Sequence, residues 1–121
     1  MLKEHLEFFA LDLSVGWETP PGYPEGIEQK ILAGSLDEGN KKGSRTRLLR
    51  FQPGAFTTEP FEHDHWEEVF LVSGSLTVGE ETFEPYTYAC RPPHTPHGPF
   101  RSDDGCLLVE THFYEAAGQV V

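Results

Sequence analysis

The sequence predicts an all-β protein, and three observations support this class. Short apolar or alternating stretches recur between turn signals along most of the 121-residue chain. Twelve glycines and ten prolines interrupt it, and helix signals are scarce. Short strands separated by regular turns are typical of a β-sandwich or a small barrel. Because a chain of this length forms one modest core, we expect residues 1–121 to be a single domain.

The N-terminal segment, residues 1–26, is expected to be an irregular arm. Within it, Leu2 to Ala10 favours either a turn or two of helix or an edge strand. The stretch from Gly16 to Gly26 contains three prolines and three glycines. Proline donates no backbone hydrogen bond, so this stretch disfavours regular structure. We expect the arm to run over another part of the molecule.

The remaining residues, 27–115, are expected to form a barrel. The candidate strands follow one another between turns: Ile27–Leu36, Ser44–Gln52, Glu68–Val78, Glu81–Arg91 and Gly105–Tyr114. Pro53-Gly54 is a turn dipeptide that ends the second strand. Gly74, inside the third, indicates a bulge or a tight bend. The last strand alternates around Leu107, Val109 and Thr111.

The residues that suggest chemistry lie before the third strand and in the proline-rich segment from Pro92 to Pro96. Side chains two apart in a strand point to the same face, so His63, His65 and Glu67 are expected to face one cavity. His97 follows the proline-rich segment. Imidazole with carboxylate suits iron, manganese, zinc, nickel or copper better than calcium or magnesium. The pattern predicts a divalent transition metal, with iron favoured and four ligands: His63, His65, Glu67 and His97.

Two other histidines, His5 and His112, stand alone in the sequence. An isolated histidine is usually a surface residue or a hydrogen-bonded one, so we do not expect either to be a ligand. Asp64, Glu62 or Glu68 are expected to accept a hydrogen bond from the second nitrogen of a ligating imidazole.

These motifs resemble those of the cupin superfamily. The first cupin motif typically reads G-x5-H-x-H-x3,4-E-x6-G, and this chain has, in order, Gly54, His63, His65, Glu67 and Gly74. The second typically reads G-x5-P-x-G-x2-H-x3-N, which resembles the run from Pro92 to His97. The resemblance covers about residues 54 to 114, half of the chain.

Cupins are small barrels with a double-stranded β-helix or jelly-roll architecture, and they are often dimers. The resemblance therefore implies a cupin-type fold, a homodimer and a metal inside the barrel. In the family, the first motif supplies two histidines and a glutamate, and the second supplies one histidine. The glutamate and the last histidine correspond here to Glu67 and His97.

The chain departs from the family pattern in both motifs. Only one residue separates His65 from Glu67, where three or four are usual. With the usual spacing before Glu67, the second histidine of the motif would be His63, and Phe61 would occupy the position of the first histidine. The second motif has His94 where glycine is usual. These departures leave open which further residue completes the ligand set: His65, Glu68 or His94.

The sequence favours a metal-dependent enzyme that acts on a small organic substrate, and a dioxygenase is the first choice. Three or four protein ligands would leave positions for a substrate and dioxygen. A lyase, isomerase or cyclase is the alternative, with the metal polarising a carbonyl and Glu67 or Glu68 moving a proton. A non-catalytic ligand-binding cupin and a metal-free interaction domain are the remaining alternatives.

Aromatic and basic side chains are candidates to contact the substrate. Tyr86 and Tyr88 are two apart, so they are expected to share a face and to present their hydroxyls together. An arginine turned into the barrel would clamp a carboxylate through two hydrogen bonds. The candidates for that role are Arg47, Arg50, Arg91 and Arg101.

Charge and composition disfavour several other classes. Nine basic and twenty acidic residues give a formal net charge of −11, which disfavours binding to nucleic acid or to an anionic membrane. No apolar run has the length of a transmembrane helix. The N-terminus lacks the apolar centre of a secretory signal, so we expect a cytoplasmic protein. Cys90 and Cys106 are then expected to be reduced, half-buried thiols.

Overall fold

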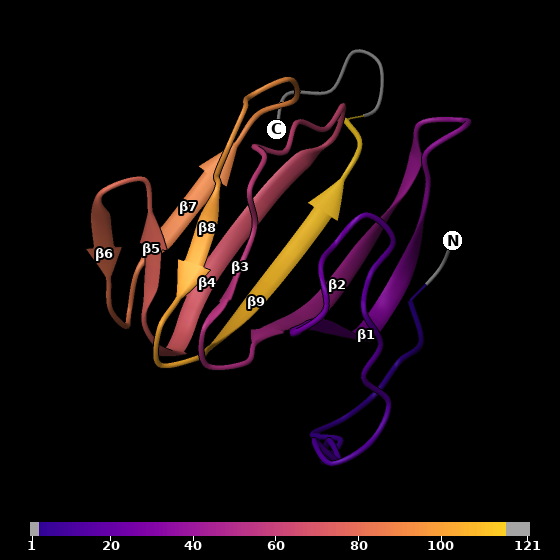
Figure 1. Ribbon diagram of the computed structural model, residues 1–121. Helices are drawn as coiled ribbons and strands as arrows, with labels where there is room; N and C mark the ends of the chain where they lie inside the picture. The colour runs from indigo at the N-terminus through magenta and orange to yellow at the C-terminus, as the bar shows by residue number, and fades with distance from the viewer. Residues whose placement is uncertain (1–2, 116–121) are drawn as a thin grey trace.

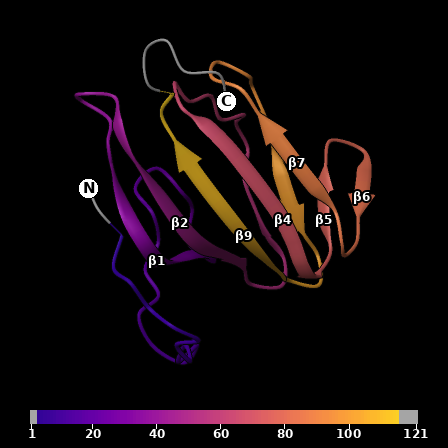
Figure 2. The ribbon, with the colours of Figure 1, turned by 180° about the vertical axis from the view of Figure 1, so that it is seen from behind.

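The computed structural model describes residues 3–115, which form two antiparallel β-sheets (Figure 1). The larger sheet has the strand order β1-β2-β9-β4-β7, and the smaller has the order β3-β8-β5-β6. Figures 1 and 2 show the smaller sheet lying over one face of the larger. The strands are β1 (Ile27–Asp37), β2 (Lys42–Phe51), β3 (Ala55–Phe56), β4 (Trp66–Gly74), β5 (Leu76–Val78), β6 (Glu81–Phe83), β7 (Tyr88–Arg91), β8 (Phe100–Ser102) and β9 (Cys106–Phe113).

The all-β class predicted from the sequence is confirmed, and most predicted strands lie close to observed ones. β1 and β2 pair along their whole length, with a bulge between Ile31 and Ala33. The bend predicted at Gly74 is also observed, because β4 ends there and β5 begins two residues later. Gly74 has a φ of 80°, a left-handed conformation that side chains other than glycine rarely adopt.

Replacing Gly74 by alanine should lower the free energy of unfolding by more than the same change at Gly79. Both glycines have positive φ, which costs about 1–2 kcal/mol for alanine. A Cβ at Gly74 would also collide with the backbone of Gly105, whereas a Cβ at Gly79 would meet nothing within 4 Å. Urea unfolding followed by circular dichroism measures both variants. Equal losses at the two positions would contradict the close approach of Gly74 to Gly105.

Two sequence predictions about secondary structure are wrong. The stretch from Glu81 to Arg91 is not one strand but two, β6 and β7, with residues 84–87 between them. Pro85 lies in this interval and cannot donate to a strand ladder. The stretch from Leu2 to Ala10 is neither helix nor strand over residues 3–10, and Leu2 lies outside the described residues.

The interior between the sheets is apolar at one end and polar at the other. Alternation along each strand sends every second side chain inward. The apolar end contains eight buried residues: Ile27, Leu49, Phe51, Val69, Leu71, Leu76, Cys106 and Leu108. The same inward faces continue into buried polar side chains at the other end: Arg47 on β2, Glu67 on β4, and Glu110 and His112 on β9.

The alternation read from the sequence of β9 marks its outer face. Leu107, Val109 and Thr111 lie there only partly buried, whereas Leu108, Glu110 and His112 are buried inside. Glu110 and His112 were therefore not predicted to lie inside. In a sequence that alternates with period two, a buried polar side chain cannot be told from an exposed one.

The described residues also bear on the cysteines and on membrane insertion. Cys90 and Cys106 are both free, as predicted, but neither is half-buried, since Cys90 is exposed and Cys106 is in the core. Residues 3–115 include no helix with the length and hydropathy needed to cross a membrane.

Candidate metal centre

Three side chains from two distant stretches of the chain converge at the polar end of the interior. Donor atoms of His63, Glu67 and His97 all lie within 4.8 Å of one another. His63 lies in the segment before β4, Glu67 lies on β4, and His97 lies between β7 and β8. These three of the four residues predicted as ligands are therefore brought together.

Backbone hydrogen bonds hold the two histidine-bearing segments against each other. Phe61 and His97 exchange both of their backbone hydrogen bonds, at 2.7 and 2.9 Å. The backbone N–H of His94 donates to the carbonyl of His63 at 2.6 Å. His94 contributes this backbone contact, but its side chain is exposed.

The fourth predicted ligand, His65, lies beside this group. Its ring stacks on that of His63 with centroids 4.7 Å apart and an interplanar angle of 9°. His65 is buried, and its Nδ1 lies 3.0 Å from the backbone carbonyl oxygen of Trp66. Since a carbonyl only accepts, this nitrogen carries the proton and Nε2 is left with a free lone pair.

The same arrangement fixes the tautomer of His97. Its Nδ1 donates to the carbonyl of Thr95 at 3.0 Å, which leaves Nε2 unprotonated and 3.6 Å from Glu67 Oε1. A ligating histidine typically donates its second nitrogen to a carbonyl or carboxylate, which fixes the ring. The carbonyls of Trp66 and Thr95 take this role for His65 and His97. The prediction that Asp64, Glu62 or Glu68 would accept from these two rings is therefore wrong.

Burial keeps the imidazoles in the form that binds metal. Desolvation, opposed by the charge of Glu67, lowers the pKa of His63 to about 4. Desolvation also lowers the pKa of His65. Both rings are therefore neutral at pH 7, as coordination requires.

Glu67 is the link between this group and a second buried set of polar side chains. Its Oε1 accepts from Arg91 Nη1 at 2.6 Å, and its Oε2 contacts His112 Nε2 at 2.9 Å. Burial and Glu110 favour the neutral acid, but the hydrogen bond from His112 holds the pKa of Glu67 below its ordinary value. Glu67 is therefore an ionised carboxylate at neutral pH.

His112 orients Glu67 through a fixed tautomer. Arg45 approaches its Nδ1 through Nε at 3.2 Å and Nη2 at 2.7 Å. Since arginine only donates, Nδ1 is the acceptor and Nε2–H donates to Glu67. His112 is only 1 % exposed.

Glu110 completes a buried ion pair behind the centre. Arg47 donates to Glu110 Oε1 from Nε and Nη2, each at 2.8 Å. The same guanidinium donates to Gln29 at 2.7 Å and to Tyr23 Oη at 3.1 Å. Donor atoms of Glu67, Glu110 and His112 also lie within 4.8 Å of one another. The contacts with arginine and within this second group already satisfy these atoms, so the first group is the candidate metal site.

Other predicted site residues lie elsewhere. Glu68 is on the outer face of β4, where its Oε1 accepts from Tyr88 Oη at 2.6 Å. Tyr86 and Tyr88, candidates to contact a substrate, are 76 % and 57 % exposed. Of the four arginines, Arg47 and Arg91 turn inward and bind carboxylates. Arg50 pairs with Glu28, and Arg101 pairs with Asp103 at the surface.

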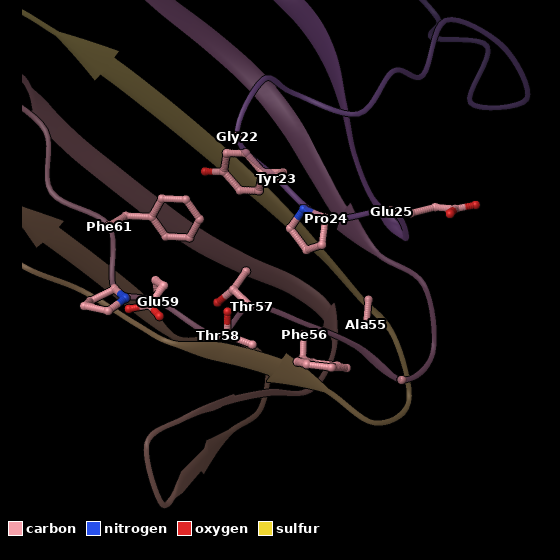
Figure 3. A pocket seen from close by; sticks show the side chains of 12 residues that line it. Gly22, Tyr23, Pro24, Glu25, Ala55, Phe56, Thr57, Thr58, Glu59 and Phe61 are labelled. Atoms are coloured by element: carbon pink, nitrogen blue, oxygen red, sulfur yellow. The ribbon is translucent and has the colours of Figure 1, made fainter.

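A surface groove of about 550 Å³ lies next to the centre (Figure 3). The segment containing Tyr23 and the segment containing Phe61 line it from opposite sides. These two rings stack with centroids 4.8 Å apart, and the ring of Phe61 lies 6.2 Å from that of His63 and 6.1 Å from that of His97. Phe61 therefore lines the groove and also lies near both histidine rings.

Solved structures show the same fold. An RmlC-like cupin from Shewanella frigidimarina superposes with a TM-score of 0.66 at 19% identity, covering 99% of this chain and 100% of the other. An acetylacetone dioxygenase from Acinetobacter johnsonii has a TM-score of 0.66 at 18% identity, covering 100% and 87%. The polyketide cyclase RemF from Streptomyces resistomycificus has a TM-score of 0.65 at 18% identity, covering 88% and 79%.

The sequence comparisons lead to the family. A search of curated proteins found no match. The family model described as the ChrR cupin-like domain matches residues 14–114. This match spans most of the chain and includes both histidine-bearing segments. The cupin resemblance read from the motifs is thus confirmed, and the chain belongs to the ChrR cupin-like domain family of the cupin superfamily.

Proposed function

We propose that this cupin is a metal-dependent enzyme that acts on a small organic substrate, with His63, His65, Glu67 and His97 as ligands of a divalent transition metal. The observation that carries the proposal is the 4.8 Å limit that encloses the donor atoms of His63, Glu67 and His97. Two ligand atoms that each lie about 2.1 Å from one ion are at most about 4.2 Å apart. Shifts of a few tenths of an ångström would therefore bring the donor atoms of His63, Glu67 and His97 around one ion.

The residues around the centre have distinct roles in this proposal. A bound metal would supply Lewis-acid chemistry to a substrate oxygen. The carbonyls of Trp66 and Thr95 keep the rings of His65 and His97 in place. Arg91 places a positive charge beside Glu67, where it can hold an anionic part of the substrate.

Dioxygenase chemistry with iron is the favoured reaction, with manganese, zinc and nickel as alternatives. A histidine-rich set with a carboxylate suits these metals, and a structural neighbour named as an acetylacetone dioxygenase supports the choice. Metal analysis of the purified protein, followed by oxygen uptake with β-diketones and dihydroxyaromatics, tests it. We expect about one metal per chain and substrate-dependent uptake. No metal after growth with iron, manganese and zinc would overturn the enzyme proposal.

The same site supports a lyase, isomerase or cyclase as the second candidate. Glu67 is ionised, so it can accept a proton from the substrate, and such a reaction consumes no dioxygen. The structural neighbour named as a polyketide cyclase supports this reading. Turnover that continues under nitrogen would favour this candidate over the dioxygenase.

Two adjacent glutamates provide a matched test of the ligand set. Glu67→Gln should weaken metal binding by at least about tenfold, since the loss of even an outer-shell partner costs about 10- to 100-fold. Glu68→Gln makes the same chemical change on the outer face and should leave metal affinity unchanged. Titration with a competing chelator measures both affinities. Equal effects of the two substitutions would contradict the placement of Glu67 in the centre.

A further inference from the structure

A half-open, largely apolar cavity of about 250 Å³ lies beside the proposed metal centre, and the exposed Tyr88 is part of its lining. Its wall comes from five strands of the two sheets and consists largely of apolar side chains: Val69, Leu71, Leu76, Val78, Phe83, Ala89 and Leu108. Transfer of apolar surface from water to an apolar environment is favourable. The apolar wall of this cavity therefore favours a ligand with an apolar part.

Arg91 connects this cavity to the centre. It lines both the apolar cavity and a smaller space of about 30 Å³ that also touches Glu67 and His97. Val69, Leu76 and Leu108 likewise line both spaces. The smaller space is about twice the minimum that holds one water molecule, so it has room for only the end of a ligand.

The guanidinium of Arg91 has hydrogen-bonding capacity to spare. Arginine carries five N–H donors, and within residues 3–115 Arg91 makes one hydrogen bond, from Nη1 to Glu67. Its side chain is 19 % exposed. Unused donors at the edge of an apolar cavity favour a ligand that has acceptor oxygens at one end.

We propose that this cavity holds the hydrocarbon part of a small amphipathic anion, whose anionic oxygens lie on Arg91 next to the metal centre. The head is a carboxylate or an enolate, since either presents the acceptors that Arg91 lacks. An apolar cavity of about 150 Å³ accepts a benzene-sized ring, so 250 Å³ accommodates a tail of up to about ten carbons. This inference rests on the proposed function and deepens it by naming a substrate class.

Binding of straight-chain carboxylates, from butanoate to dodecanoate, tests the tail. Isothermal titration calorimetry would use the metal-free and the metal-loaded protein, with the metal content of each sample measured separately. We expect affinity to rise about fourfold per added methylene and to stop rising by about ten carbons. Affinity that does not depend on chain length, or that climbs through dodecanoate without a plateau, would overturn the proposal.

Two substitutions localise the tail. Ala89→Leu and Val78→Leu each add bulk inside the cavity and should move the plateau to shorter chains. Cys90→Leu adds bulk on the same strand as Ala89 but on its exposed face, and it should leave the plateau unchanged. If the cavity variants fail to fold, the chain-length series on the unaltered protein still decides. An unchanged plateau in both folded cavity variants would overturn the proposal.

Two comparisons test the head group. Carboxylates should bind more tightly than alcohols of equal length, and Arg91→Gln should remove this preference while Arg101→Gln keeps it. A preference that survives Arg91→Gln would show that the head lies elsewhere and overturn that part of the proposal. Acetylacetonate competing with hexanoate would identify the enolate as an alternative head, and its failure to compete would assign the carboxylate alone.

The cavity inference and the proposed function can fail separately. Chain-length-dependent binding to a protein that takes up no metal would refute the enzyme proposal but retain the cavity. Metal binding without any dependence of carboxylate affinity on chain length would refute the cavity inference but retain the enzyme proposal.

Discussion

Replacing Arg47 by methionine is expected to lower the free energy of unfolding by about 3–5 kcal/mol, because it leaves a buried carboxylate without its partner. The guanidinium of Arg47 and the carboxylate of Glu110 are 4 % and 7 % exposed. The substitution also removes the hydrogen bonds from Arg47 to Gln29 and Tyr23. Urea unfolding of the metal-free protein measures the loss without a contribution from metal binding.

Arg50→Met is the matched control on the same strand. Arg50 also pairs with a glutamate, Glu28, at 3.0 Å, but both side chains are about one-quarter to one-third exposed, at 31 % and 26 %. Pairs in contact with water contribute about 0–1 kcal/mol. A loss at Arg50 equal to that at Arg47 would contradict the distinction between the two pairs.

Removing both Arg47 and Glu110 should lower the free energy of unfolding by less than removing Arg47 alone. Replacing a buried ion pair by apolar side chains of similar volume is often neutral or stabilising. Arg47→Met combined with Glu110→Leu should therefore recover much of the stability lost by Arg47→Met alone. A double variant less stable than the single variant would show that the pair itself holds the interior together.

The effect of Arg47→Met should also depend on pH. Although burial favours the neutral acid, the charge of Arg47 and hydrogen bonds from Arg47 and His112 hold the pKa of Glu110 well below its ordinary value of 4.5. A lowered carboxyl pKa stabilises the fold above the unfolded pKa, and this stabilisation is lost as pH falls toward the folded pKa. The stability difference between the unaltered protein and Arg47→Met should therefore be full at pH 7 and shrink below pH 4.5.

The second large effect is expected on metal binding from His97→Ala, which removes the ligand from the second motif. Loss of a direct ligand should weaken affinity by more than the roughly 10- to 100-fold typical of outer-shell partners. His94→Ala is the matched control, because the His94 side chain is exposed and only its backbone contacts His63. Competition with a fluorescent chelator measures both variants. Full occupancy of His97→Ala would show that the proposed ligand set is wrong.

Local signals in the sequence were sufficient for much of the fold and for the three side chains that the structure brings together. β1 and β2 followed from their alternation and from the turn signals around them. The bend at Gly74 was predictable because few other residues adopt its conformation. His63 and Glu67 were candidates because they lie near each other at the start of a strand with an even spacing, and His97 was a candidate because it follows the proline-rich segment.

The rest of the site depends on information that one sequence does not contain. A period-two pattern does not say which face of a strand is inward, and β9 was therefore read around Leu107 rather than Leu108. Glu110 and His112 share their phase with the apolar residues Cys106 and Leu108, and this shared phase is the signal that would have placed them inside. The pairing of Glu67 with Arg91 depends on the register between β4 and β7, which neither strand specifies alone.

Anomalous diffraction from crystals of the manganese-loaded protein would locate the cation most directly. We expect one strong peak at coordinating distance from imidazole nitrogens of His63 and His97 and from a carboxylate oxygen of Glu67, with His65 as the fourth ligand. A peak outside the barrel, or one that coordinates only one of the two histidine-bearing segments, would contradict the metal centre proposed for this cupin.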